Sequence, residues 1–122
     1  MNKNGSFINT RIKSIAFAFK GTLYLIRTEA SIQVQFVIAL LVTGLGFYFN
    51  ISKVEWFVQI LAIGLVMSIE SINTAIEALT DFIHPEYHKK IGIIKDISAG
   101  AVFIASFFAI IVGLIIYIPK LY

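Results

Sequence analysis

Residues 68–81, Ser-Ile-Glu-Ser-Ile-Asn-Thr-Ala-Ile-Glu-Ala-Leu-Thr-Asp, carry three acids and an amide inside a strongly apolar sequence. Their spacing puts Glu70, Asn73, Glu77 and Asp81 on one side of a helix, because residues three or four apart are neighbours there. A charged side chain costs roughly 2.5–3.5 kcal/mol near the centre of a bilayer. A membrane helix therefore keeps such a stripe for a use, and the simplest use is to hold a divalent metal and move a proton.

The rest of the sequence places this stripe in a membrane protein. Hydrophobic residues make up 58% of the 122 residues and charged residues only 14%, whereas about 25% of a soluble domain is charged. Cysteine is absent, which excludes disulfides and thiolate metal sites. We therefore expect an all-α integral membrane protein in which residues 1–122 form a single membrane domain.

The first segment, residues 7–28, has the pattern of an amphipathic helix, and the polar residues 1–6 before it are expected to be frayed. Lys13, Lys20 and Arg27 recur every seven residues. A separate apolar stripe is formed by Ile12, Ile15, Phe19 and Ile26. Helices of this kind lie in the plane of the lipid headgroups. A signal peptide is excluded, because Lys20 interrupts the apolar core and no small-residue cleavage site follows.

Three later segments are long and apolar enough to be membrane helices, residues 30–49, 54–83 and 97–118. The second should end before Pro85, since proline disfavours helical geometry in the residue that precedes it. At 1.5 Å per residue, Glu70 lies about 24 Å from the start of this helix. The hydrocarbon is about 30 Å thick, so the acidic stripe is expected at the mouth of the membrane.

Basic residues flank the predicted spans unevenly. Only Lys53 and Lys120 lie on one side of the membrane. The other side carries Lys3, Arg11, Lys13, Lys20, Arg27, Lys89, Lys90 and Lys95. Cytoplasmic segments carry the excess of lysine and arginine. We therefore expect a multi-pass protein of the cytoplasmic (inner) membrane, with its N-terminus and the loop 84–96 in the cytoplasm, where ATP is available.

Several polar residues also have an ordinary structural interpretation. Glu29 fits a carboxylate at a helix end, and Asp81 fits a solvated acid at the interface. Lys95 and Asp96 fit a cap on the third span, with the lysine reaching for water and the acid favouring the helix N-terminus. His88 fits a loop histidine.

Glu70 differs from these residues, because a carboxylate at a hydrophobic position favours a functional role. With Glu77, Asn73 and Lys95 it makes a plausible Mg²⁺-phosphate site, since hard cations prefer oxygen ligands and phosphates need a cation. The sequence contains neither the phosphate-binding loop Gly-x-x-x-x-Gly-Lys nor a kinase glycine loop. A nucleotide enzyme built from this chain must therefore have another design.

Two motifs carry a resemblance to a known family. They are residues 70–77, Glu-Ser-Ile-Asn-Thr-Ala-Ile-Glu, and residues 94–102, Ile-Lys-Asp-Ile-Ser-Ala-Gly-Ala-Val. Lys20-Gly21, Glu29 and His88 match as well. Together they closely resemble the small prokaryotic membrane lipid kinases, the diacylglycerol kinase/undecaprenol kinase family. The resemblance covers nearly the whole chain, including the layout of a surface helix followed by three spans.

The resemblance implies a set of catalytic and metal-binding roles. Glu70 corresponds to the general base that takes the proton of the lipid hydroxyl, and Asn73 to an amide that organises the site. Glu29 and Glu77 correspond to ligands of Mg²⁺, and through the metal to parts of the nucleotide site. The family also implies a homotrimer with composite sites.

The remaining implied residues bind ATP. Lys95 and Asp96 correspond to nucleotide contacts, while Glu86 and His88 fall in the loop that touches the nucleotide. Three positions depart from the family pattern: Gln35 stands where some members carry a second acid, Phe17 where the nucleotide-binding helix can carry tyrosine, and Ile93 at a position that is often basic or small. These departures concern lipid and adenine recognition.

The expected function is transfer of the γ-phosphate of Mg-ATP to the hydroxyl of a membrane lipid, either diacylglycerol or undecaprenol. The expected partners are this lipid, ATP and the membrane, with no nucleic acid. Two other functions stay open, namely an oligomeric ion or proton channel lined by Glu70 and Glu77, and a structural membrane subunit. The kinase and the channel both use the acidic stripe. For both we expect an oligomer, because three spans are too few to enclose the stripe, and the resemblance implies a trimer.

Overall fold

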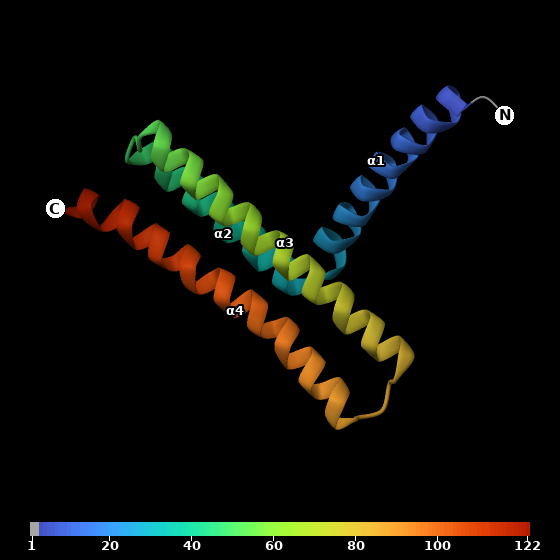
Figure 1. Ribbon diagram of the computed structural model, residues 1–122. Helices are drawn as coiled ribbons and strands as arrows, with labels where there is room; N and C mark the ends of the chain where they lie inside the picture. The colour runs from blue at the N-terminus through green and yellow to red at the C-terminus, as the bar shows by residue number, and fades with distance from the viewer. Residues whose placement is uncertain (1–2) are drawn as a thin grey trace.

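The computed structural model describes residues 3–122, which form four α-helices and a short terminal 3₁₀-helix (Figure 1). In chain order these elements are α1 (Lys3–Thr28), α2 (Ala30–Tyr48), α3 (Lys53–Ile83), α4 (Lys89–Tyr117) and η1 (Ile118–Leu121). The predicted all-α class is confirmed.

α1 begins earlier than the sequence pattern suggested. Of the residues expected to fray, residues 1 and 2 lie outside the described residues, whereas residues 3–6 belong to the helix. The Thr10 hydroxyl donates a hydrogen bond to the Ser6 carbonyl oxygen at 2.7 Å. The first N–H groups of a helix have no partner inside it, so polar residues are well suited to this position. The prediction of a frayed segment is therefore wrong for residues 3–6.

A tight turn joins α2 to α3. Asn50 has a φ of 52°, which lies in the left-handed region that asparagine tolerates. Ser52 then caps α3 in a reciprocal capping box, in which the Glu55 N–H donates to Ser52 Oγ at 3.2 Å and the Ser52 N–H donates to Glu55 Oε1 at 2.8 Å. The two helices approach so closely here that a Cβ added to Gly46 would lie 2.6 Å from the Trp56 ring.

α4 begins at Lys89, well before the predicted third span at 97–118. His88 is its N-cap, and the His88 Nδ1 accepts a hydrogen bond from the Lys90 N–H at 3.1 Å. The next proline after this cap is Pro119, so the helix runs without a break to Tyr117. Hydrophobicity indicates where a helix meets hydrocarbon, and the helix itself extends beyond that point.

The predicted loop 84–96 is correspondingly shorter, because only residues 84–88 lie between the helices. Lys95 and Asp96 lie inside α4 and do not cap it. The interpretation of these two residues as a helix cap is therefore wrong, and their side chains are displayed from a rigid element.

The helices α2, α3 and α4 run side by side, while α1 leaves the bundle at an angle near the start of α2 (Figure 1). α3 packs most extensively against α4, and α2 packs against α3. The turn between α2 and α3 and the C-terminus lie at one end of the bundle, and the connection 84–88 lies at the other (Figure 1). Lys53 begins α3 and Lys120 belongs to η1, so both lie at the end of the bundle opposite the connection 84–88.

The bundle is apolar outside and partly polar inside. Phe47, Leu61 and Phe103 are 72–74% exposed, as expected for side chains that face lipid. The buried polar side chains are Gln59, Glu70, Asn73, Thr80 and Ser98. Three helices within the described part of the chain are long and apolar enough to cross a membrane: Ala30–Tyr48, Lys53–Ile83 and Lys89–Leu121. The predicted membrane protein with three spanning helices is confirmed at this level.

Candidate active site

The first part of the polar side of α3 faces the inside of the bundle, whereas Glu77 and Asp81 further along it are exposed. Glu70 and Asn73 are only 7% and 8% exposed, whereas Ile72 and Leu79 on other sides of the helix are each 57% exposed. This is the reverse of a soluble amphipathic helix, and it follows from a helical repeat that sets the polar residues apart from the apolar ones. The helical period therefore turns Glu70 and Asn73 toward the other helices of the bundle and leaves the isoleucine and leucine to face lipid.

Glu70 is 7% exposed, and its carboxylate takes part in no hydrogen bond or ion pair within residues 3–122. Its two oxygens are not among the fully buried atoms that lack a partner, so they keep some access from outside the chain although most of the side chain is covered. The Glu70 oxygens are thus available to a group that comes from outside the chain.

Asn73 and Glu77 act as a pair one turn further along α3. Asn73 Nδ2 donates to Glu77 Oε1 at 3.3 Å, and the Thr80 hydroxyl donates to the Glu77 backbone oxygen at 2.9 Å. Asn73 Oδ1 is buried and has no partner within the described chain. Carboxylate and amide oxygens are the ligands that Mg²⁺ takes in proteins. The residues present therefore fit a hard cation.

Asp81 and Lys95 join α3 to α4 near the connection between them. Lys95 Nζ donates to Asp81 Oδ1 in a hydrogen-bonded ion pair. The Asp81 side chain is 61% exposed and the Lys95 side chain is 36% exposed, so water and salt weaken the pair. Asp81 is exposed, as expected for an interfacial acid, but its link to Lys95 was not predicted. Lys95 is thus a cation held beside the acidic side of α3.

Glu29 lies at the break between α1 and α2, where it is the N-cap residue of α2. Glu29 thus lies at a helix end, as its ordinary interpretation expects, although its side chain makes no capping hydrogen bond. Helical hydrogen bonds reach Glu29 from both sides, since the Glu29 N–H donates to the Leu25 oxygen at 2.9 Å and the Gln33 N–H donates to the Glu29 oxygen at 3.0 Å. Glu29 itself is extended, with φ −104° and ψ 114°, and the chain turns there.

The predicted nucleotide residues lie around the start of α4. His84 Nδ1 is 2.7 Å from the Glu86 carbonyl oxygen, which fixes the short connection, and His88 caps α4 through its ring. Asp96 and the Glu86 side chain are exposed. His88, Lys95 and Asp96 therefore all lie within the first turns of one helix.

The pair Glu29 and Glu77 stays a prediction as a set of metal ligands. Within residues 3–122 no group of three or more histidine or acidic side chains is close enough to hold a metal ion. Glu70, Asn73 and Glu77 share one side of α3, and Glu29 lies at the start of α2.

Polar residues at the opposite end of the bundle were missed by the sequence reasoning. Tyr117 donates from its hydroxyl to Gln59 Oε1 and lies 3.2 Å from the Val42 carbonyl oxygen, which links all three spanning helices. Lys120 pairs with Glu55 at 3.1 Å. A signal was present, because Gln59 stands in an apolar stretch and lies eleven residues, or about three turns, before Glu70.

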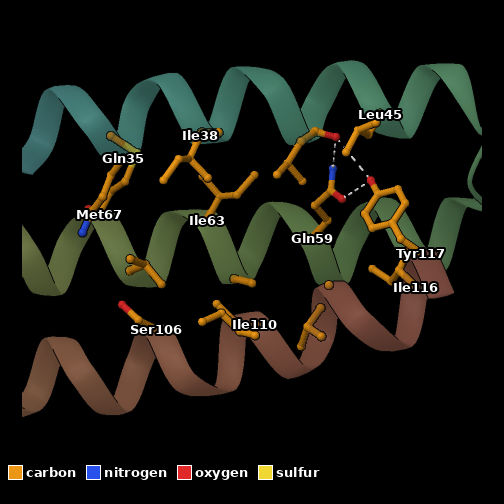
Figure 2. A pocket seen from close by; sticks show the side chains of 17 residues that line it. Gln35, Ile38, Leu45, Gln59, Ile63, Met67, Ser106, Ile110, Ile116 and Tyr117 are labelled. Carbon is orange, nitrogen blue, oxygen red and sulfur yellow. Dashed lines mark hydrogen bonds between the residues drawn. The ribbon is translucent and has the colours of Figure 1, made fainter.

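A groove of about 430 Å³ lies between α2, α3 and α4 (Figure 2). Its lining is almost entirely apolar. Gln35 and Met67 lie together at one end, and Gln59 and Tyr117 lie at the other (Figure 2). Gln35 Oε1 is buried and has no partner among the residues described. The sequence reasoning noted Gln35 only as a departure from the family pattern.

Comparison with known proteins gives one consistent result. The sequence model of the prokaryotic diacylglycerol kinase family matches residues 16–117. The undecaprenol kinase of Bacillus subtilis strain 168 is 37% identical over 114 residues, which cover 93% of each chain. The diacylglycerol kinase of Escherichia coli strain K12 is 32% identical over 111 residues, which cover 91% of each chain.

The family match extends over α2, α3 and α4 and the second half of α1, and it includes the acidic side of α3 and the start of α4. It agrees with the resemblance carried by residues 70–77 and 94–102. The chain therefore belongs to the prokaryotic diacylglycerol kinase family.

Proposed function

We propose that this protein is an ATP-dependent lipid kinase that transfers the γ-phosphate of ATP to the hydroxyl of diacylglycerol or undecaprenol. The observation that carries the proposal is Glu70, a largely covered glutamate on the polar side of a membrane helix whose accessible carboxylate oxygens have no partner within residues 3–122. Relatives named for both lipids support the reaction class equally. Family membership favours this function over a channel or a structural subunit.

In the proposed reaction, the lipid hydroxyl gives its proton to the Glu70 carboxylate while its oxygen attacks the γ-phosphorus. The bond from the γ-phosphorus to the bridging oxygen breaks, and ADP leaves. General bases must reach the proton they remove, and the free Glu70 oxygens meet this need from the bundle interior. Positioning and charge neutralisation supply most of the catalysis in phosphoryl transfer.

Glu77 and Glu29 are the proposed ligands of Mg²⁺, which when bound would neutralise phosphate charge. Asn73 donates to Glu77 Oε1 and so orients the carboxylate toward a ligand. The unpartnered Asn73 Oδ1 adds an oxygen of the right kind beside it. Asn73 is thus proposed to organise the site.

Lys95, Asp96, Glu86 and His88 are the proposed nucleotide contacts. Lys95 is already positioned by Asp81, and an exposed ion pair of this kind is weak enough for a phosphate to displace the carboxylate. His88 and the connection before α4 are fixed by hydrogen bonds. A nucleotide at this end of α4 would therefore meet a preorganised surface.

We propose that α1 lies on the cytoplasmic surface and that the connection 84–88 is cytoplasmic. Ile12, Ile15 and Phe19 on α1 are 60–70% exposed, which suits a helix that rests on lipid. The basic residues near this end support the same orientation.

One experiment tests the reaction and the orientation together. Inverted and right-side-out membrane vesicles containing the protein receive labelled ATP outside and either diacylglycerol or undecaprenol in the bilayer. We expect phosphorylated lipid only in inverted vesicles, because their cytoplasmic face is outside. Activity confined to right-side-out vesicles would contradict the orientation, and an absence of product with both lipids in both vesicle types would contradict the function.

We also propose that the working unit is a homotrimer whose sites combine residues of different chains. The absence of any group of three acidic or histidine side chains within residues 3–122 supports this, as does the unpartnered oxygen of Asn73. The apolar exterior of the bundle gives ample surface for helix contacts.

Composite sites predict rescue between inactive variants. Asn73→Ala mixed with Lys95→Ala, or Glu29→Ala mixed with Glu70→Ala, should regain lipid phosphorylation in at least one pair, since a mixed oligomer contains one site built from intact segments. The variants are denatured, reassembled together and assayed, with co-purification of differently tagged chains as proof of mixing. If every mixed pair stays inactive, each site lies within one chain.

A further inference from the structure

The groove between α2, α3 and α4 has one end whose polar groups are satisfied and one end where they are not. At the satisfied end the Tyr117 hydroxyl donates to Gln59, and Gln59 Nε2 lies 3.4 Å from the Val42 carbonyl oxygen. These contacts link the three helices, and each of the two polar side-chain atoms of Gln59 has a partner.

The other end holds Gln35, whose Oε1 is buried without a partner among residues 3–122. Burying an oxygen without a donor is unfavourable, and the surrounding groove is apolar, so a water would find few partners there. Met67 lines the groove beside Gln35 and precedes Glu70 by one helical turn. The unsatisfied end of the groove therefore lies next to the proposed general base.

We infer that this groove binds the hydrocarbon chain of the lipid acceptor, with the Gln35 side chain accepting a hydrogen bond from the lipid hydroxyl as it enters. The inference rests on the proposed function, and it places the tail of the substrate. An acceptor whose hydroxyl reaches Glu70 must lay its chain along apolar side chains, and the groove begins at that point. Gln35 and Leu45 both line it, which gives a length of about 15 Å along α2.

Gly113 allows the inner part of the groove to be filled without disturbing its walls. It lines the groove, and a Cβ added there would meet no atom within 4 Å. It lies about 10 Å further along α4 than Ser106, which lines the end near Met67. A leucine at Gly113 would therefore obstruct a long chain and leave room for a short one.

Gly64 on α3 is the matched control. A Cβ added there also meets no atom within 4 Å, and Gly64 does not line the groove. The full-length protein and its Gly113→Leu and Gly64→Leu variants are assayed in one detergent with dihexanoylglycerol and dioleoylglycerol, and with farnesol and undecaprenol. Each pair of acceptors shares its polar end and differs in chain length.

For Gly113→Leu we expect kcat/KM with the long-chain acceptor to fall by at least about tenfold. This is the low end of the change in kcat/KM that one extra or missing methylene causes in an apolar pocket. The value with the short-chain acceptor should stay near that of the unaltered protein, and Gly64→Leu should resemble the unaltered protein with both. Activity with the short acceptor also demonstrates that the variant is folded.

Two results overturn the inference. If Gly113→Leu loses activity equally with short and long acceptors, or changes the oligomeric state, the groove is a contact between copies of the chain. If the long acceptor is unaffected, its chain lies elsewhere. Should Gly113→Leu fail to fold, Gln35→Leu decides: a raised KM for the lipid with an unchanged KM for ATP is expected, and an unchanged KM for both rules the inference out. A protein that phosphorylates no acceptor contradicts the proposed function instead.

Discussion

Replacing Glu70 with glutamine should lower the rate of lipid phosphorylation by about 10²–10⁴-fold, the range over which a positioned general base accelerates reactions. Glutamine keeps the size of the side chain but cannot take the proton of the lipid hydroxyl. Because Glu70 is 7% exposed and has no donor within the described chain, the variant loses no hydrogen bond of the native fold. Its thermal stability in detergent should be equal or higher, since an amide is cheaper to bury than a carboxylate.

The matched control is Glu55→Gln, a change of the same kind on the same helix. Glu55 pairs with Lys120 at the end of the bundle that carries Gln59 and Tyr117, so its loss should weaken that pair and leave turnover nearly intact. Initial rates at saturating ATP and lipid, together with thermal unfolding in detergent, separate the two effects. Near-normal turnover of Glu70→Gln would contradict the role of Glu70 as the general base.

Truncating either proposed metal ligand should abolish activity. Glu77→Ala and Glu29→Ala each remove a carboxylate that Mg²⁺ prefers, and loss of even an outer-shell partner costs about 10–100-fold in metal affinity. We therefore expect at most about one hundredth of the activity at ordinary magnesium concentrations. Glu77→Ala also removes the acceptor of the Asn73 hydrogen bond.

Titration of Mg²⁺ at fixed ATP gives the decisive measurement, with Glu55→Ala as the control that also removes one carboxylate. Both ligand variants should require more magnesium for half-maximal activity, and binding of Mg-ATP, followed by calorimetry without lipid, should weaken. An unaltered magnesium requirement in both variants would refute the ligand assignment. If Glu29→Ala alone keeps the normal magnesium requirement, Glu77 is a metal ligand and Glu29 is not.

The period of the polar residues in α3 was sufficient to predict that Glu70 and Asn73 share a buried side of a membrane helix. Apolar run length was sufficient to predict three spanning helices. The start of α4 was not predictable in this way, because hydropathy responds to the bilayer and the helix begins at the His88 cap outside it.

Contacts between helices were beyond reach of the sequence. The pairing of Asp81 with Lys95 depends on how α3 and α4 align after the connection 84–88, and the link of Tyr117 to Gln59 depends on alignment over the whole length of α4. These are properties of packing, which a periodic pattern does not encode.

The exposed apolar exterior of the bundle has a consequence for its thermodynamics. A soluble domain has a large positive heat capacity of unfolding because unfolding brings apolar surface into water. Phe47, Leu61 and Phe103 face outward in the folded state, and separating the helices within a bilayer leaves such side chains in hydrocarbon. Helix separation should therefore have a small heat capacity change, its free energy should vary almost linearly with temperature, and cold should not dissociate this bundle.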